Sequence, residues 1–177
     1  MTAMNMFTID ERPDLVPDSV LAQLRVLVES YPEIRIIEID PQYSGGDVFC
    51  EHYGVPPRNG LNCVVVHGTR GEQSATAACL TPVGGRLRLN SSVRKHLGMR
   101  SVSMFDRESL LVQTGMEYGS VTPVGLPAEW HVLIPPLPED LEYIVVGGGL
   151  QVSKLRLPPL ALMALPNAAM LPDLLQD

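Results

Sequence analysis

The residues of this sequence that could do chemistry gather around two glycine-rich segments. The first segment runs from Gly115 to Pro127 and reads GMEYGSVTPVGLP, and the second is the triple glycine at 147–149. Because glycine has no Cβ, a ligand can approach its backbone N–H groups closely, and such groups can stabilise negative charge on a reacting carbonyl oxygen. The same glycines also suit tight turns with positive φ, so the residues alone leave both interpretations open.

Polar residues inside the first segment and elsewhere in the sequence suggest further candidates. Cys63 could act as a nucleophile, but no histidine lies close to it in the sequence, and a buried structural thiol is favoured. His67 could polarise a water, although a surface or hairpin histidine is the more ordinary role. Glu117 and Tyr118 lie inside the first glycine segment and could contact a substrate amino group or a ribose. The four histidines and three cysteines lack metal-ligand spacing, so we expect neither a metal nor a cofactor.

Charge is distributed unevenly along the chain. The formal net charge is −7, which argues against a protein that coats itself in nucleic acid. A local basic stretch can still attract phosphate, because salt screens charges only beyond roughly 8–10 Å. These bases could equally be ordinary solvated surface charges. The basic stretch consists of Arg86, Arg88, Arg94, Lys95, Arg100 and Arg107.

Hydrophobic periodicity and turn residues predict the elements that position these segments. The strands at 63–67 and 75–80 should pair as a hairpin, and a short helix is expected after Pro166. Helices are expected at 18–31, 47–53, 90–98, 106–115 and 160–165, and strands at 34–40, 63–67, 75–80, 102–105, 131–134, 143–146 and 150–157.

These elements predict a mixed α/β (α+β) fold in a single domain. We expect a mostly antiparallel, partly closed central sheet of about seven strands with helices packed outside, because hairpins rather than crossovers join most of the strands. Residues 1–17 would be a lead-in, 18–165 the domain and 166–177 a tail. No apolar run is long enough to span a membrane and the first residues lack a signal-peptide pattern, so we expect a cytoplasmic protein without a membrane partner.

Four segments together form a distinctive pattern. They are YGVPP at 53–57, TGMEYGSVTPVGL at 114–126, the triple glycine at 147–149 and LRLP at 155–158. In this order they resemble the YbaK / prolyl-tRNA-synthetase-associated family of aminoacyl-tRNA editing domains. The resemblance covers about residues 18–165.

The resemblance implies an activity and its partners. Members of this family hydrolyse the ester between a small mischarged amino acid and the 3′-terminal adenosine of tRNA, without a metal. We therefore expect a free-standing aminoacyl-tRNA deacylase for alanine, cysteine or serine esters. Its partners would be the aminoacylated tRNA end and an aminoacyl-tRNA synthetase, and the protein would be a monomer or a homodimer.

The resemblance, together with the position of Lys154 and the basic stretch, suggests which residues form the site. The catalytic set would hold water and supply oxyanion donors; it consists of Asn62, Gly119, Ser120 and Thr122. The substrate-binding set would be Val121, Pro123, Gly125, Leu126, Gly147, Gly148 and Lys154. The tRNA contacts would be Arg86, Arg88, Arg94, Lys95 and Arg100.

One position departs from the family pattern. The family carries a lysine in the spacing G-V-P-P-x-x-x-x-K, and counting from Gly54 puts this position at Asn62. A neutral donor in place of a cation weakens a hydrogen bond by about 1–1.5 kcal/mol, or roughly tenfold in rate or affinity. Lys154 could supply the missing charge from another direction. The alternatives are a weakened or inactive homologue that binds aminoacyl-tRNA or a nucleotide-like ligand, and a pocketed domain that binds a protein partner.

Overall fold

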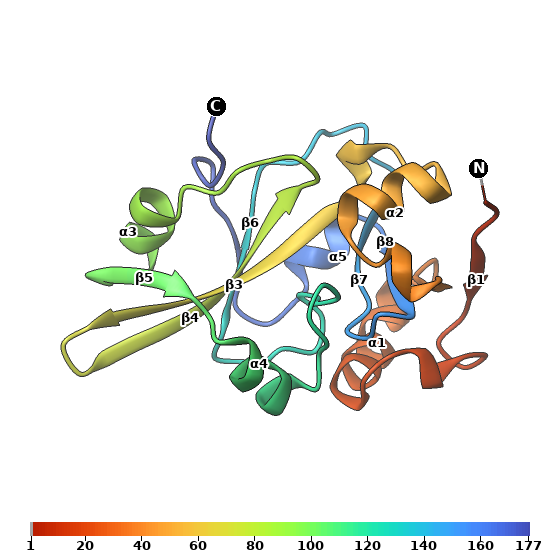
Figure 1. Ribbon diagram of the computed structural model, residues 1–177, viewed down its shortest axis with the longest axis horizontal. Helices are drawn as coiled ribbons and strands as arrows, with labels where there is room; N and C mark the ends of the chain where they lie inside the picture. Colours follow the sequence, from red (N-terminus) through yellow and green to blue (C-terminus); the bar gives the residue numbers. More distant parts are fainter. Residues whose placement is uncertain (1) are drawn as a thin grey trace.

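Residues 2–177, which this computed structural model describes, contain nine strands in two sheets (Figure 1). The four-stranded sheet has the order β1-β2-β8-β7, and each pair of neighbours is antiparallel. Its strands are β1 (Asn5–Phe7), β2 (Arg35–Glu38), β7 (Ile144–Gly147) and β8 (Ser153–Leu157).

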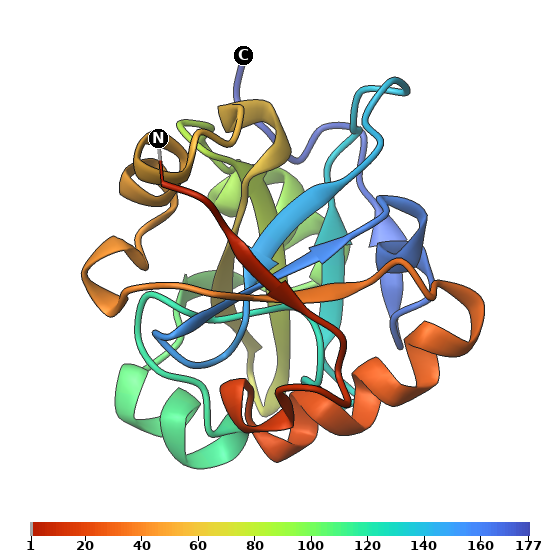
Figure 2. The same cartoon turned by 90° about the vertical axis from the view of Figure 1, so that its right-hand side faces the viewer.

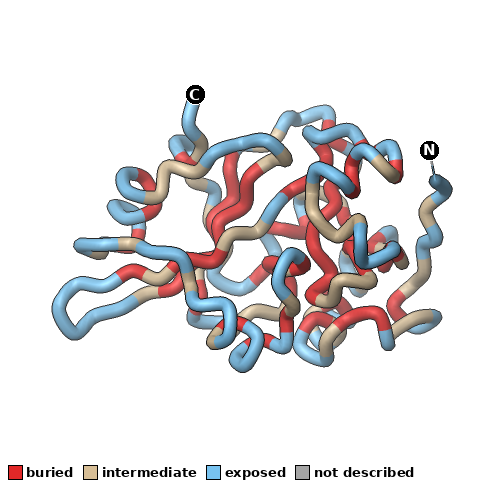
Figure 3. The backbone as a smooth tube through the Cα atoms, viewed as in Figure 1, coloured by how far each residue is buried: buried red, intermediate tan, exposed pale blue. Residues whose placement is uncertain are grey.

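The five-stranded sheet is built on the long hairpin of β3 and β4, whose far end projects from the body of the molecule (Figures 1 and 3). β5 lies antiparallel to β3, whereas β6 runs parallel to β4, and β9 runs parallel to β6. A bridge from Gly60 to Val145 joins the start of β3 to β7 of the other sheet. The strands are β3 (Leu61–Arg70), β4 (Gln73–Pro82), β5 (Ser101–Met104), β6 (His131–Ile134) and β9 (Ala168–Met170).

Helices cover the outside of the sheets (Figure 2). The first helix ends just before Pro32, which cannot donate the next helical hydrogen bond. The fourth begins after Asp106, whose carboxylate accepts the N–H of Ser109 at 2.9 Å as an N-cap. The helices are α1 (Asp18–Ser30), α2 (Gly46–Tyr53), α3 (Arg94–Leu97), α4 (Arg107–Thr114) and α5 (Leu160–Met163), and a π-helical turn at Leu89–Val93 precedes α3.

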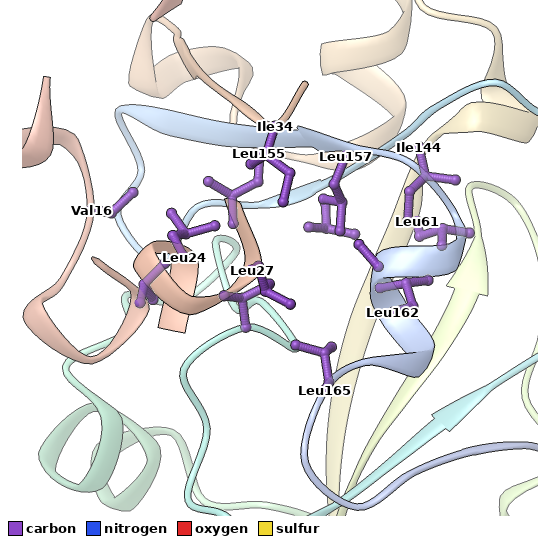
Figure 4. Packing of buried hydrophobic residues seen from close by; sticks show 14 of the residues in the cluster. Val16, Leu24, Leu27, Ile34, Leu61, Ile144, Leu155, Leu157, Leu162 and Leu165 are labelled. Atoms are coloured by element: carbon purple, nitrogen blue, oxygen red, sulfur yellow. The ribbon is translucent and has the colours of Figure 1, made fainter. Parts of the chain in front are cut away.

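The largest hydrophobic core lies between α1, the four-stranded sheet and α5 (Figure 4). Leu24 and Leu27 of α1 contribute from one side, and Leu155 and Leu157 of β8 and Leu162 of α5 from the other. All five are at most 5% exposed, and burying one such side chain contributes about 1.5–3 kcal/mol. This packing fixes β8, and therefore the residues on its opposite face.

The predicted fold class is confirmed, with two differences in detail. The described residues form nine strands rather than about seven, and two sheets rather than one. The helix expected after Pro166 is wrong, because Ala168–Met170 is strand β9. This segment returns to the open edge of β6, where its backbone groups find partners. Likewise, β1 within the lead-in pairs with β2.

Candidate active site

A cavity of about 470 Å³ opens where the start of β3 meets β7 and β8. Four further segments complete its wall: the start of α2, the end of β5, α4 and the first glycine segment. The cavity is lined by Gly45 and Gly46 at the start of α2, Leu61–Val65 of β3, Met104 and Phe105 at the end of β5, Arg107 and Leu110 of α4, Tyr118, Gly119 and Val121 of the first glycine segment, and Gly147 and Lys154 of β7 and β8.

The first glycine segment is clamped onto the glycine hairpin that joins β7 to β8. The N–H of Glu117 donates to the carbonyl of Gly149 at 2.8 Å, and the N–H of Gly149 donates to the carbonyl of Ser120 at 2.7 Å. The side chain of Gln151 donates to the carbonyl of Tyr118 at 3.1 Å. These bonds hold the backbone between Glu117 and Ser120 in one conformation at the cavity wall.

Gly119 and Val121 line this cavity and have unpaired backbone donors. No residue in the range 2–177 accepts a hydrogen bond from either N–H, whereas the N–H of Ser120 between them donates to Glu117. Gly119 has φ of +81°, a conformation that favours glycine. Gly46, across the cavity, is the first residue of α2, and the N–H groups of a helix's first turn have no partner within the helix. The wall therefore carries unpaired amides on two sides.

Close approach explains why positions 147 and 148 are glycines. A Cβ on Gly147 would lie 2.5 Å from the carbonyl oxygens of Ser120 and Val121, and a Cβ on Gly148 would overlap the hydroxyl of Ser153. The glycine segment can therefore lie against this hairpin only if side chains are missing there. Gly147 has this structural role in addition to lining the cavity.

Lys154 brings a buried cation to the cavity. Only 6% of the Lys154 residue is exposed, and its Nζ donates to the carbonyl of Ser44 at 2.6 Å. The Nζ also lies 5.5 Å from the centre of the Phe49 ring. Burial disfavours the charged ammonium and lowers the pKa of Lys154 to about 8. Asn62 lines the same cavity, and its Oδ1 lies against Gly46.

The other residues of the expected glycine-loop site do not line this cavity. Thr122 and Pro123 are buried in the loop, where the Thr122 hydroxyl accepts the N–H of Val124 at 3.4 Å. Gly125 packs against α1 and donates its N–H to the side chain of Gln23 at 2.6 Å. Gly125 and Leu126 border a separate hollow beside α1. The hydroxyls of Ser120 and Ser153 are buried and lack a hydrogen-bond partner among the described residues.

The basic stretch is divided by the fold. Arg107 lines the cavity, whereas Arg86, Arg88, Arg94, Lys95 and Arg100 do not. Arg88 forms an ion pair with Asp177 at 3.0 Å and donates to the carbonyl of Leu175. α3, which carries Arg94 and Lys95, lies beside β5 and away from α2 (Figure 1).

The remaining polar candidates have ordinary roles. Burial raises the pKa of the Cys63 thiol well above its usual value, so the thiol stays protonated. His67 pairs with Thr76 at 3.1 Å, and the Glu117 carboxylate accepts the N–H of Gln151 at 3.3 Å. Among residues 2–177, no group of three or more His, Cys, Asp or Glu side chains could hold a metal ion. No helix in this range is long and apolar enough to cross a membrane.

Sequence reasoning missed part of the cavity wall. Gly45 and Gly46 were visible only as a helix start, and Phe105 and Leu110 only as apolar residues of a strand and a helix. The Gly-Gly pair at positions 45–46 was the available signal, because two adjacent glycines at a helix start leave room for close approach.

Comparison with known proteins identifies a family and several similar folds. The model of the family described as the aminoacyl-tRNA editing domain matches residues 41–165. None of the curated proteins matches the chain.

Three solved structures share the fold, each at 18% sequence identity and with 99% of its own chain covered. One is a scaffold protein from work on epitope grafting by computational design, with a TM-score of 0.72 over 92% of this chain. Another was described as a candidate trans-editing enzyme for prolyl-tRNA synthetase, with a TM-score of 0.69 over 92%. The third is a hypothetical protein, with a TM-score of 0.72 over 87%.

Proposed function

We propose, because this chain belongs to the aminoacyl-tRNA editing domain family, that it hydrolyses the ester between a small mischarged amino acid and the 3′ end of a tRNA. The amino acid would be alanine, cysteine or serine. The observation that carries this activity is the cavity whose lining residues include Gly119 and Val121, with unpaired amides, and the buried cation of Lys154.

The reaction needs a positioned water and donors for an oxyanion, because an aminoacyl ester is already activated. The water oxygen would attack the ester carbonyl carbon, and the carbonyl oxygen would become negatively charged. The amides of Gly119 and Val121 would donate to this oxygen. The bond from the carbonyl carbon to the ribose oxygen would then break, and the ribose oxygen would take up the proton released by the water.

Lys154 would supply the charge that the family lysine supplies elsewhere. Asn62 occupies the family position, and Lys154 of β8 lines the same cavity. A charge-assisted hydrogen bond contributes about 1.5–3 kcal/mol, compared with about 0.5–1.5 kcal/mol for a neutral one. We therefore assign the strong donor to Lys154 and a weaker positioning contact to Asn62.

The rest of the expected site would support these groups. Gly147 and Gly148 would admit the glycine loop, and Thr122, Pro123, Gly125 and Leu126 would hold its far end on α1. An apolar wall would receive a small uncharged side chain; it consists of Leu61, Cys63, Val65 and Leu110. The acceptor stem would then meet the exposed bases on and beside α3, which are Arg94, Lys95 and Arg100.

A second candidate function is binding without hydrolysis. Asn62 in the lysine position favours it, since a site that has lost its main cation could keep a ligand and lose turnover. The substrate or a nucleotide-like ligand would then remain bound rather than be cleaved. Salt-sensitive tRNA binding without loss of the amino acid would identify this function.

A panel of tRNAs charged with labelled alanine, cysteine or serine tests the deacylase. The wild-type protein should release at least one label, and Lys154→Ala should slow that release about tenfold or more, the factor expected when a charge-assisted hydrogen bond is lost. Arg156→Ala is the matched control, because it removes another cation of β8. The Arg156 guanidinium stacks on Tyr143 and does not line the cavity. An unchanged rate in Lys154→Ala would reject the role of Lys154.

Asn62→Lys in the same panel separates the two candidate functions. If the wild-type protein releases no label and Asn62→Lys does, binding without hydrolysis is the function of this chain. If neither protein releases a label or binds tRNA, both candidates fail.

A further inference from the structure

Two exposed side chains stand at the mouth of the cavity. The guanidinium carbon of Arg107 lies 3.6 Å from the centre of the Tyr118 ring. Tyr118 is 63% exposed, and so is Met104 beside them on the cavity rim. Lys154, by contrast, is 6% exposed. The cavity therefore has a deep end with a buried cation and a mouth with an aromatic ring, a guanidinium and a thioether.

The Arg107–Tyr118 pair is held in place from both sides. Arg107 is the first residue of α4, just after the Asp106 cap. Tyr118 lies in the first glycine segment, where its carbonyl accepts a hydrogen bond from the side chain of Gln151 at 3.1 Å. No carboxylate of residues 2–177 forms an ion pair with Arg107. In a protein with a net charge of −7, this cation keeps its charge available for a ligand.

We infer that the Arg107–Tyr118 pair binds the terminal base of the tRNA, with adenine stacked on the Tyr118 ring and the adjacent phosphate near Arg107. This inference rests on the proposed function, because it places the nucleoside at the mouth when the ester lies at the deep end. Unpaired RNA bases are commonly recognised by stacking on aromatic rings and on guanidinium planes. Arg107 covers one part of the ring and fixes its orientation, and the exposed remainder offers a surface to a base.

A single-stranded RNA end fits this mouth better than a peptide does. An exposed aromatic ring next to an unpaired arginine matches the alternation of a flat base and a phosphate along a nucleic-acid strand. The cavity wall contains two cationic side chains and no carboxylate, so it suits an anionic phosphate better than the basic side chains of a peptide. An acidic protein could bind RNA here because the cationic groups are local to the cavity and only the terminal nucleotide would enter.

Binding of two RNA hairpins tests this inference without any need for hydrolysis. Both hairpins carry a tRNA acceptor stem with an unpaired CCA end, and in one of them the terminal adenosine is replaced by an abasic nucleotide. Measured by fluorescence anisotropy, the wild-type protein should prefer the adenine-bearing hairpin about tenfold, since one stacked base changes affinity by roughly 5- to 150-fold. Tyr118→Leu should reduce this preference to less than twofold, and Tyr118→Phe should retain it.

Arg107→Met tests the second half of the pair. It should weaken binding of both hairpins and lower the dependence of the affinity on salt, because one phosphate contact is lost. Arg25→Met is the matched control, since Arg25 is exposed on α1 and does not line the cavity. Equal losses in the two variants would show a general charge effect and would reject the phosphate contact.

Each result bears on one assignment. A wild-type protein that binds both hairpins equally, or a Tyr118→Leu variant that keeps the preference, overturns the base-stacking role. If charged tRNA is hydrolysed but no adenine preference exists, this inference fails and the deacylase stands. If the preference exists but no charged tRNA is hydrolysed, the deacylase fails and the base site stands.

Discussion

Burying the ammonium of Lys154 costs the folded state free energy, and the proposed reaction gives this cation a chemical role. Its ammonium is almost fully removed from water and has one hydrogen bond, to the carbonyl of Ser44. Burial that shifts a pKa by one unit corresponds to about 1.36 kcal/mol. A cation kept in such a place despite this cost is typical of functional sites, where pKa values are commonly perturbed.

The pH dependence of hydrolysis should report this lysine. In the proposed reaction the protonated form of Lys154 is the oxyanion donor, and burial lowers the pKa of Lys154 to about 8. The value of kcat/KM for the charged tRNA should therefore fall as the pH rises through about 8, after correction for spontaneous ester hydrolysis. Lys154→Arg should remove this falling limb, because arginine stays protonated. A profile that is flat from pH 7 to 9.5 in the wild-type protein would contradict the role of the ammonium.

The free energy of unfolding should also depend on the protonation of Lys154, but it should rise with pH where the rate of hydrolysis falls. The folded state lowers the pKa of Lys154 from 10.5 to about 8, so the unfolded chain binds more protons between these values and stability rises with pH there. At pH 7 the charged side chain costs the folded state roughly 3 kcal/mol at most. Lys154→Met should therefore unfold at higher urea concentration than the wild-type protein at pH 7, while hydrolysis is lost. This gain should shrink as the pH approaches 10.5.

Sequence reasoning at the residue scale reached part of the site. Asn62, Gly119, Gly147 and Lys154 meet at one cavity. The resemblance pointed to the first three, and Lys154 was expected as a replacement for the missing family lysine. Gly125 belongs to the same family loop pattern and was also expected in the site, but it lies against α1. A glycine that admits a ligand and a glycine that admits a helix are identical in the sequence, and only the fold separates them.

At the scale of elements, the glycine loop and the β7–β8 hairpin form one interlocked unit. The loop accepts and donates hydrogen bonds at Gly149, and the two segments touch at Gly147 with no room for a Cβ. Because both segments also line the cavity, a change in their packing changes the position of the donors. Stability and activity should therefore respond together at this contact.

Gly147→Ala tests this coupling. The new Cβ would lie 2.5 Å from two carbonyl oxygens, and overpacking of this kind costs about 1–3 kcal/mol. We expect a lower urea midpoint together with a loss of hydrolysis. Gly71→Ala is the control: Gly71 has φ of +60° and open space around it, so alanine should cost about 1–2 kcal/mol of strain and leave hydrolysis unchanged. Normal activity in Gly147→Ala would show that the donors do not depend on this contact.

The elements themselves differ in how well the sequence predicts them. The helix after Asp106 and the hairpin of β3 and β4 agree with the expectation, because caps and turn residues mark their ends. Strands β1 and β9 have three residues each, too few for a period-2 pattern. Each forms because it pairs with a longer strand of the folded protein, β1 with β2 and β9 with β6. That pairing depends on the tertiary structure and not on the local sequence.

At the scale of the whole molecule, the residues after β9 tie the basic stretch to the five-stranded sheet. Leu174 is fully buried with Val66, Val93 and Leu97. The Ser92 hydroxyl donates to the carbonyl of Asp173 at 2.7 Å. Which partner such a segment finds depends on how both sheets are assembled, so composition and periodicity could not predict it.

Leu174→Ala should destabilise the protein without touching the cavity. Truncating a buried leucine costs about 2–5 kcal/mol, and the urea midpoint should fall accordingly. Under conditions where the variant remains folded, kcat at saturating tRNA should stay within about twofold of the wild-type value, because no residue of the 171–177 segment lines the cavity. A large loss of activity in the folded variant would indicate that α3 is coupled to the site.

The hydrogen bonds between Gly149 and the glycine loop also determine when the protein can act. The donors sit on the loop, but their positions are set by a hairpin some thirty residues further along the chain, so neither half of the site exists until the two have docked. A copy that is newly made or damaged and has not closed this contact should therefore lack the proposed esterase activity and leave every charged tRNA intact.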